Sequence, residues 1–394
     1  MKFLKALLFL LVLPPVLLLA WFYLTSPVYR FIPPQPFSGN KIYNPYQEID
    51  STRWLAGNFQ VQTRVWLGIT NGRKNTSEAV WNAYRWMGYD IIAISDYQAI
   101  NRVFEDSSGY IAVYEHGYGI HKTHQVCLGS RSVLWRDYPL GATLSQKQHI
   151  IDLLLNDNDL VALAHPDLRN GYRPEELKYL SGYHLMEVLN GARVSLAHWD
   201  TALSWGYPAF ILADDDAHDI SNPDEIGKYI TFIAASSTET SEILRRLKQG
   251  SAYGVRVLTH QRGQGFIKRL PRLISCEVKD VDTLEVVFSD TAREIRFVGQ
   301  GGKIRSIHRQ TTLGAFPFGQ QDTYLRVEAE FEGKAILYLN PVFRYQGGEI
   351  QLPKRASVDT QATLTLRVIL WACLGIMSFI FLKIKKKQKH HGRA

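Results

Sequence analysis

Two segments of the chain share one pattern, LVALAHPD at residues 160–167 and PAFILADDDAHD at residues 208–219. Each starts with a short apolar run typical of a buried strand and ends in residue types that commonly bind metals. Strand-like and helix-like segments alternate on both sides of them, from about residue 57 to residue 257. Such alternation predicts an α/β fold with parallel strands, either a barrel or a doubly wound sheet.

The individual elements follow from local patterns. Residues 59–65 alternate like a strand, and residues 76–88 and 145–157 have the periodicity of amphipathic helices. No GxGxxG or Walker motif occurs, which argues against the nucleotide-binding versions of the fold. After residue 257 the helical patterns stop, and strand-like runs joined by turns follow. We therefore expect a barrel at residues 57–257 and a small antiparallel β-sandwich at residues 270–350.

Both ends of the chain are apolar. Residues 6–24 and 364–382 are each long enough to cross a hydrocarbon core of roughly 30 Å. A cleaved signal peptide is the alternative for the first run, but no small-x-small site follows it. The sequence therefore predicts four flanking segments: an N-terminal transmembrane anchor at 1–26, a linker at 27–56, a C-terminal transmembrane helix at 363–382 and a basic cytoplasmic tail at 383–394.

The net charge of +8 comes entirely from the two ends. The eight uncompensated cations are Lys2, Lys5, Lys383, Lys385, Lys386, Lys387, Lys389 and Arg393. The body is therefore neutral overall and gives no electrostatic case for nucleic-acid binding, while anionic lipid is the expected partner of the tail. Positive residues flank both apolar runs on their terminal sides, which predicts two spans, cytoplasmic termini and an extracytoplasmic body at residues 27–362.

Polar residues recur directly after, or at the end of, the predicted strands. In a parallel β–α fold, ligand sites lie at the carboxyl ends of the strands, so these residues are expected to converge. They are Asp96, Tyr97, Glu115, His165, Glu187, Asn190, Asp216 and His218. The three cysteines form no CxxC pair, so a cysteine-based zinc finger or a disulfide scaffold is excluded.

Five motifs resemble, in order and spacing, the PHP family (polymerase and histidinol phosphatase domains). They are ISDY, VYEHGYGIHKTHQVCLG, ALAHPD, MEVLNG and DDDAHD, and the resemblance covers about residues 57–256. It implies a distorted seven-stranded barrel of the (βα)7 type, up to three divalent metals and hydrolysis of phosphoesters. It also implies that Glu115, His124 and His165 form one metal subsite, and that Asp216 and His218 belong to subsites whose other ligands are gone.

The chain departs from the family where the family opens with His-x-His, an acidic residue and then Asp-His. Those positions here are Gln60, Gln62, Asn71 and Asp96-Tyr97. A neutral amide is a poor ligand for a zinc-like cation, so a full three-metal centre is not expected. Two imidazoles and one carboxylate suit a single zinc, manganese or iron ion with an open position, and the alternative is no metal.

The residue roles follow from this chemistry. Asp216 or His218 is the expected general base, and the two are also candidate metal ligands. Gln60, Gln62, Tyr97 and Asn190 are the expected substrate contacts, for an anionic phosphorylated substrate. The first hypothesis is a membrane-anchored, extracytoplasmic, metal-dependent phosphoesterase with a reduced metal site. The alternatives are a catalytically degenerate module that binds a ligand or partner in the cell envelope, and a structural scaffold. Monoesters, diesters, nucleotides and envelope polymers all stay open as substrates.

Overall fold

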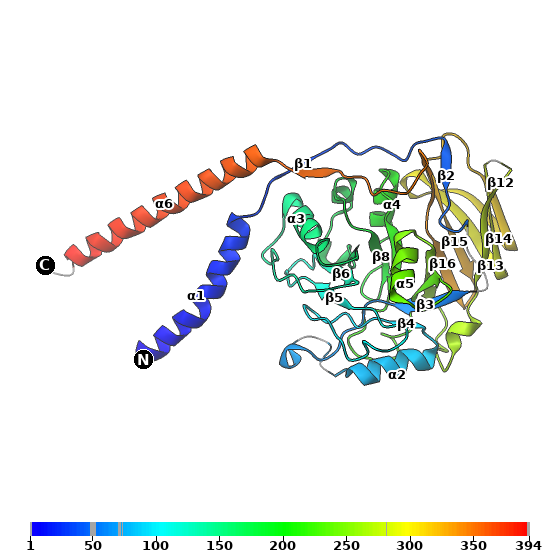
Figure 1. The fold of residues 1–394 in the computed structure, drawn as a ribbon, viewed down its shortest axis with the longest axis horizontal. Coiled ribbons are helices and arrows are strands. Elements are labelled where there is room, and N and C mark those ends of the chain that lie inside the picture. Colours follow the sequence, from blue (N-terminus) through cyan, green and yellow to red (C-terminus); the bar gives the residue numbers. More distant parts are fainter. Residues whose placement is uncertain (1, 48–52, 70–71, 73, 281, 392–394) are drawn as a thin grey trace.

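The computed structural model describes residues 2–47, 53–69, 72, 74–280 and 282–391 (Figure 1). The candidate residue Asn71 lies outside these residues. A mixed α/β body holds most of the chain, and two long helices project from one side of it (Figure 1).

A five-stranded sheet forms one half of the body. Its strands, in spatial order, are β5 (Val113–His116), β6 (Gln125–Leu128), β7 (Leu160–Leu163), β8 (Leu185–Asn190) and β9 (Phe210–Asp214). Every residue of these strands is buried, as expected for a sheet covered on both faces. Strands β7, β8 and β9 are parallel, but β6 is antiparallel to both of its neighbours. The expectation of parallel strands fails there because the short connection from β5 to β6 permits only a hairpin.

An eleven-stranded sheet runs through the rest of the body. Its main path is β12 (Leu273–Lys279), β13 (Thr283–Gly299), β15 (Tyr324–Phe331), β16 (Ala335–Leu339), β11 (Ala252–Val257), β10 (Tyr229–Ala234), β3 (Trp54–Asn58) and β4 (Ile91–Ile92). Off this path, β14 (Lys303–Pro317) pairs with β13, and β17 (Val342–Tyr345) joins β15 to β2 (Lys41–Tyr43).

This sheet includes the strands of residues 270–350, the region where a small antiparallel β-sandwich is expected. Strand β16 pairs antiparallel with β11 over five residue pairs, from Tyr253 with Leu339 to Val257 with Ala335. The C-terminal strands therefore continue the sheet of the first region. The physical reason is that β11 would otherwise present a row of unpaired backbone groups at a sheet edge. The exact division of the chain into domains stays a prediction.

The strand expected at residues 59–65 lies earlier, at β3. Beyond Asn58, side chains accept hydrogen bonds from backbone N–H groups that would otherwise pair with a neighbouring strand. Phe59 N donates to Asp214 Oδ1 at 2.5 Å, and Thr63 N donates to Asp96 Oδ1 at 2.6 Å. Val61 keeps one isolated parallel bridge, to Ala217, and Tyr97 forms another with Glu115. These bridges join the two sheets beside the predicted site, and closure into a seven-stranded barrel stays a prediction.

Helices of 9 to 11 residues complete the body. They are α2 (Ser77–Met87), α3 (Leu144–Leu154), α4 (Leu196–Ser204) and α5 (Thr240–Lys248), with short 3-10 turns η1 (Trp66–Gly68), η2 (Leu168–Asn170), η3 (Pro174–Lys178), η4 (Phe266–Arg269) and η5 (Gln300–Gly302). Thr76 caps α2 by accepting from Ala79 N, and Thr143 forms a capping box with Gln146 at α3. Helix α2 ends at Gly88, whose φ of 104° suits glycine.

The projecting helices are α1 (Lys2–Leu24) and α6 (Thr360–His391). Within α6, Thr360–Phe381 is long and apolar enough to cross a membrane, and its apolar window has no buried residue. The apolar part of α1, Leu10–Leu24, is shorter.

A two-stranded ribbon ties the bases of these helices together. It consists of β1 (Tyr29–Phe31) and β18 (Ala356–Val358), which pair antiparallel, and we call it the clasp. Beside it, Val28 N donates to Thr363 Oγ1 at 2.9 Å, and Arg367 at the start of α6 reaches back to Thr25 O at 3.0 Å. The clasp therefore fixes both helices to one place on the body.

A buried histidine away from the site makes the stability of the body depend on pH. The ring of His184 accepts from Val161 N at 3.3 Å, and burial, with a smaller contribution from Lys248, lowers the pKa of His184 to about 4. Because this is below its unfolded value near 6.5, the stabilisation is complete above pH 6.5 and is lost as the pH falls through 4. Between pH 6.5 and 4, the wild type is expected to lose about 3 kcal/mol more unfolding free energy than His184→Asn, which keeps an acceptor but does not titrate. Denaturant unfolding at several pH values measures this, and parallel pH curves for the two proteins would contradict it.

Candidate metal centre

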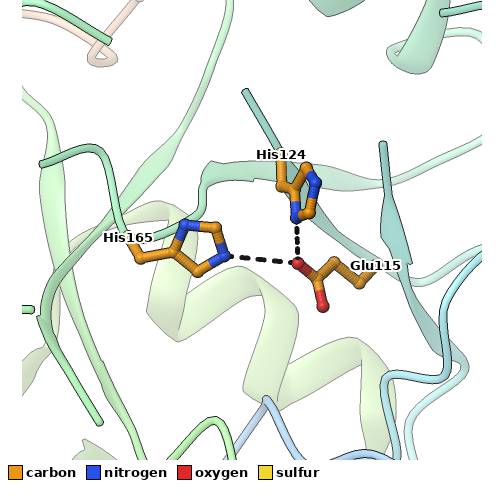
Figure 2. Close-up of side chains that lie close together, drawn as sticks. All are labelled: Glu115, His124 and His165. Carbon is orange, nitrogen blue, oxygen red and sulfur yellow. Dashed lines mark hydrogen bonds and ion pairs between the residues drawn. The ribbon is translucent and has the colours of Figure 1, made fainter. Parts of the chain in front are cut away.

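Three of the predicted ligands meet at one buried point. Glu115 lies in β5, His124 directly precedes β6, and His165 follows β7. Glu115 Oε1 is 2.5 Å from His124 Nδ1 and 3.3 Å from His165 Nε2 (Figure 2). One potential ligand atom from each residue lies within 4.8 Å of the others, and all three side chains are at most 1% exposed.

Backbone details hold these side chains in place. Gly117 has a φ of 118°, and a Cβ there would lie 2.6 Å from the His124 ring, so only glycine lets the ring pack against this turn. His165 has a φ of 28°, an unfavourable value for a residue with a side chain. Its backbone N donates to Glu187 Oε2 at 2.9 Å, which helps to hold that conformation. Backbone strain of this kind is concentrated at functional sites.

The polar atoms of this group are incompletely paired. Each imidazole directs one nitrogen to Glu115, while His124 Nε2 and His165 Nδ1 are buried without a hydrogen-bond partner. The other carboxylate oxygen of Glu115 accepts from Gln62 Nε2 at 2.6 Å. An unpaired buried polar atom costs about 1–3 kcal/mol, so the arrangement is unfavourable for stability alone. Two imidazoles and a carboxylate are also donors that a divalent zinc-like ion prefers, and the residues therefore fit such an ion.

The pKa values of the three side chains in this group are shifted in different directions. Burial raises the pKa of the Glu115 carboxyl, but the charges and hydrogen bonds of His124 and His165 outweigh burial and leave it below its usual value. Burial dominates at His124 and lowers the pKa of its imidazole. At His165, burial is outweighed by the hydrogen bond to Glu115 and the charge of Asp216, so its pKa is raised. Glu115 is thus ionised at neutral pH.

Three further carboxyls lie next to this group. Burial, followed by repulsion from neighbouring carboxylates, raises the pKa of Glu187 well above its usual value. Burial raises the pKa of Asp214 to about 8 and that of Asp216 to about 6. Each keeps one buried oxygen without a hydrogen-bond partner. The carboxyl of Asp214 is therefore largely protonated at neutral pH.

The middle aspartate of the DDD run, Asp215, has a structural role. Asp215 accepts from Tyr84 Oη at 2.9 Å and from the backbone N of Gly227, Lys228 and Tyr229 at 2.6, 2.8 and 2.9 Å. The spacing of the run alone does not separate this residue from its neighbours. The structure does, because Asp215 is fully paired while Asp214 and Asp216 are not.

The predicted substrate contacts surround the group, but mostly as part of a buried network. Gln62 donates to Glu115, as described above. Asn190 Nδ2 donates to Gln60 Oε1 at 2.9 Å and to Glu187 Oε2 at 3.0 Å. The three amides are fully buried, and only Tyr97 of the predicted contacts is partly exposed. Their role toward a substrate stays a prediction.

Asp216 and His218 lie outside the three-residue group. His218 Nδ1 contacts the backbone oxygen of Asp216 at 2.7 Å, and its Nε2 lies 3.5 Å from Tyr97 Oη. The Tyr97 ring in turn packs edge-on against His124, with 5.8 Å between ring centroids. His218 therefore lies at the partly exposed edge of the centre, and the Tyr97 ring separates it from the three buried residues.

A groove of about 440 Å³ leads to the centre. It is lined by Trp66, Ile69, Tyr97, Gln98, Gly117, Tyr118, Lys122, His124 and Trp135. The sequence reasoning missed most of these residues, and it left Glu187 and Asp214 without a role. The signal available for Glu187 was its place on a strand that also carries Asn190. The tryptophans gave none, because they come from loops far apart in the sequence.

No protein-family model matches the sequence, and no curated protein matches it. Among solved structures, the chain is similar to a two-domain protein from Bacteroides vulgatus described as containing a predicted PHP-like metal-dependent phosphoesterase. The two chains are 13% identical, with a TM-score of 0.41, and the match covers 76% of this chain and 99% of the other.

Proposed function

We propose that this protein is a membrane-anchored, metal-dependent phosphoesterase with a reduced metal site. The observation that carries the proposal is the buried group of Glu115, His124 and His165, with one unpartnered nitrogen on each imidazole. These three residues would hold a divalent ion, which would polarise a phosphoryl oxygen and make a water molecule easier to deprotonate.

Residues next to the centre transfer protons and neutralise the charge of the phosphate. The water oxygen forms a bond to phosphorus, the bond from phosphorus to the alcohol oxygen breaks, and that oxygen leaves with a proton. Asp216, with a pKa of about 6, is largely ionised at neutral pH and accepts the proton of the water. His218, at the edge of the centre, donates a proton to the departing alcohol. Lys122, which lines the groove, holds the charge of the phosphate.

The reduced metal count follows from the amides at the site. Gln60 and Gln62 occupy positions where imidazoles would serve a further ion, and their amide groups are hydrogen-bonded to Asn190 and Glu115 instead. We infer one divalent ion, drawn from zinc, manganese or iron, rather than three.

We also infer that both apolar helices cross one membrane. The clasp places their bases side by side, and Figure 1 shows both helices leaving the same side of the body. The cations at the two ends of the chain then place both termini in the cytoplasm and the body on the other face.

The test is turnover by the full-length protein in detergent, incubated separately with zinc, manganese and iron. Hydrolysis of 4-nitrophenyl phosphate or bis(4-nitrophenyl) phosphate is expected with at least one metal, and is expected to stop on chelation. A protein that binds none of these metals and hydrolyses neither ester would overturn the proposal.

A second function is favoured by one observation. The hydrogen bonds from Gln62 to Glu115 and from Asn190 to Gln60 give some of the buried polar atoms of the site neutral hydrogen-bond partners. Such a network suits a module that binds an anionic ligand without hydrolysing it. Stabilisation by inorganic phosphate with no metal bound and no turnover would favour this second function.

A further inference from the structure

The mouth of the groove carries an exposed apolar rim. Its members are Trp66, Leu67, Ile69, Tyr118, Ile120, Trp135 and Leu140. Leu67 is 95% exposed and Ile69 is 84% exposed, values unusual for large aliphatic side chains that stand together. Trp66 packs edge-on against Trp135, with 5.6 Å between ring centroids, so the two loops form one surface.

The turn that carries Trp66 and Leu67 has a strained backbone, and a hydrogen bond holds it in place. Trp66 and Leu67 both have positive φ values, 52° and 58°. Such values cost of order 1–3 kcal/mol for residues with side chains. A hydrogen bond from Trp66 Nε1 to Tyr97 O at 2.7 Å holds the turn against the site. The exposed side chains are thus held outward by a structured turn.

The rim lies beside the base of α1. Arg136, next to Trp135, donates to Phe22 O at 2.7 Å, and Leu140 N donates to Tyr23 Oη at 2.9 Å. In Figure 1, the light-blue segment between β3 and α2, which contains η1, projects from the body on the side where α1 lies. A bilayer crossed by α1 therefore starts next to this rim. Tryptophan, tyrosine and aliphatic side chains of this kind favour the membrane interface.

Inside the groove, the side chain of Gln98 has no hydrogen-bond partner, and Lys122 has a ring contact but no ion pair among the described residues. Gln98 is 6% exposed, and neither its Nε2 nor its Oε1 has a hydrogen-bond partner. Lys122 lies with its Nζ 5.6 Å from the centre of the Tyr97 ring, and among the described residues it forms no ion pair. One uncompensated cation and one unpaired amide, between an apolar rim and a metal-type centre, fit a polar anionic headgroup.

We propose that the substrate is a membrane lipid with a phosphoester headgroup, which enters the groove directly from the bilayer. The phosphate lies at the centre of Glu115, His124 and His165, its free oxygens contact Lys122 and Gln98, and the apolar chain leaves over the rim into the membrane. This inference rests on the proposed phosphoesterase function and assigns its substrate class. The hydrolysis is the one described above, with the lipid alcohol as the departing group and inorganic phosphate or its monoester as the other product.

The membrane position of the rim is tested by spin labelling of the full-length protein in phosphatidylcholine nanodiscs. A nitroxide is attached at Leu67→Cys, with Val103→Cys as the matched exposed reference, both in a Cys373→Ala background. Cys127 and Cys276 are buried and stay unlabelled. The ratio of collisions with oxygen to collisions with a water-soluble nickel chelate is expected to be at least about threefold higher at residue 67. Equal ratios at the two positions would overturn the inference.

Substrate preference is tested with one headgroup on two chain lengths, in the presence of the activating metal. Dioleoyl phosphatidic acid in nanodiscs is expected to be hydrolysed with a kcat/KM at least about tenfold above that of soluble dibutyryl phosphatidic acid. The double variant Leu67→Ser, Ile69→Ser is expected to remove this preference. Trp86→Ser, which changes another exposed tryptophan on α2, is expected to keep it.

The outcomes separate the two proposals. Equal rates on both esters would overturn the lipid assignment and leave the phosphoesterase standing. A rim inserted in the bilayer without hydrolysis of either ester or of 4-nitrophenyl phosphate would overturn the phosphoesterase and, with it, the assignment of a lipid substrate.

Discussion

The His165→Ala variant is expected to lose its divalent metal, from about one equivalent in the wild type to about one tenth or less. The physical reason is that His165 supplies one of three ligands in a closed, buried group, and among the described residues His124 is the one other imidazole in that group. Loss of even an outer partner weakens metal binding about 10- to 100-fold, and loss of a ligand is expected to weaken it by at least as much. Mass spectrometry of the purified full-length protein measures the metal content.

The matched control for this prediction is His198→Ala. His198 is also buried, but its ring contacts the backbone oxygen of Tyr172, away from the centre. It is expected to keep the metal content of the wild type. Equal loss in both variants would mean that general destabilisation empties the site, and unchanged metal in His165→Ala would remove the metal-centre assignment.

The second large effect concerns Arg326, which joins the two halves of the body. Arg326 lies in β15, is 3% exposed, and forms ion pairs at 2.7 and 2.9 Å with Asp200 of α4, besides a contact with Glu328. Arg326→Met is expected to reduce the free energy of unfolding by about 3–5 kcal/mol, because Asp200 is left as a poorly solvated charge without its partner. Denaturant unfolding followed by circular dichroism measures the loss.

Arg296→Met provides the comparison for Arg326. Arg296 also contacts Glu328, together with Glu294 and Glu330, but its side chain is 22% exposed. Water screens that network, so we expect a loss of about 1 kcal/mol or less. Similar losses in the two variants would show that burial does not govern the ion pair of Arg326.

Local sequence patterns predicted the elements that depend on local physics. Residues 76–88 contain a helix capped at Thr76, and the apolar runs before His165 and Asp214 are buried strands. The convergence of strand ends predicted that Glu115 and His165 lie close together, and the resemblance to the PHP family implied that His124 joins them. These features need only periodicity, capping residues and the general geometry of α/β folds.

Features that depend on distant residues were not predicted. The strand expected at 59–65 is displaced because side chains of Asp96 and Asp214 occupy its backbone donors. The continuity of the large sheet depends on the pairing of β11 with β16, about 80 residues further along the chain. The rim depends on Trp66 meeting Trp135, and no short-range pattern encodes that contact.

The clasp has a consequence for the order in which the molecule matures. Val28 and Thr363, which it brings together, are 335 residues apart in the sequence. At synthesis rates of 5–20 residues per second, β1 waits roughly 20 to 70 s for its partner strand after it has left the ribosome. During that interval β1 presents an open strand edge at the base of α1. Completion of the clasp therefore covers a strand edge that stays exposed while the residues between β1 and β18 are synthesised.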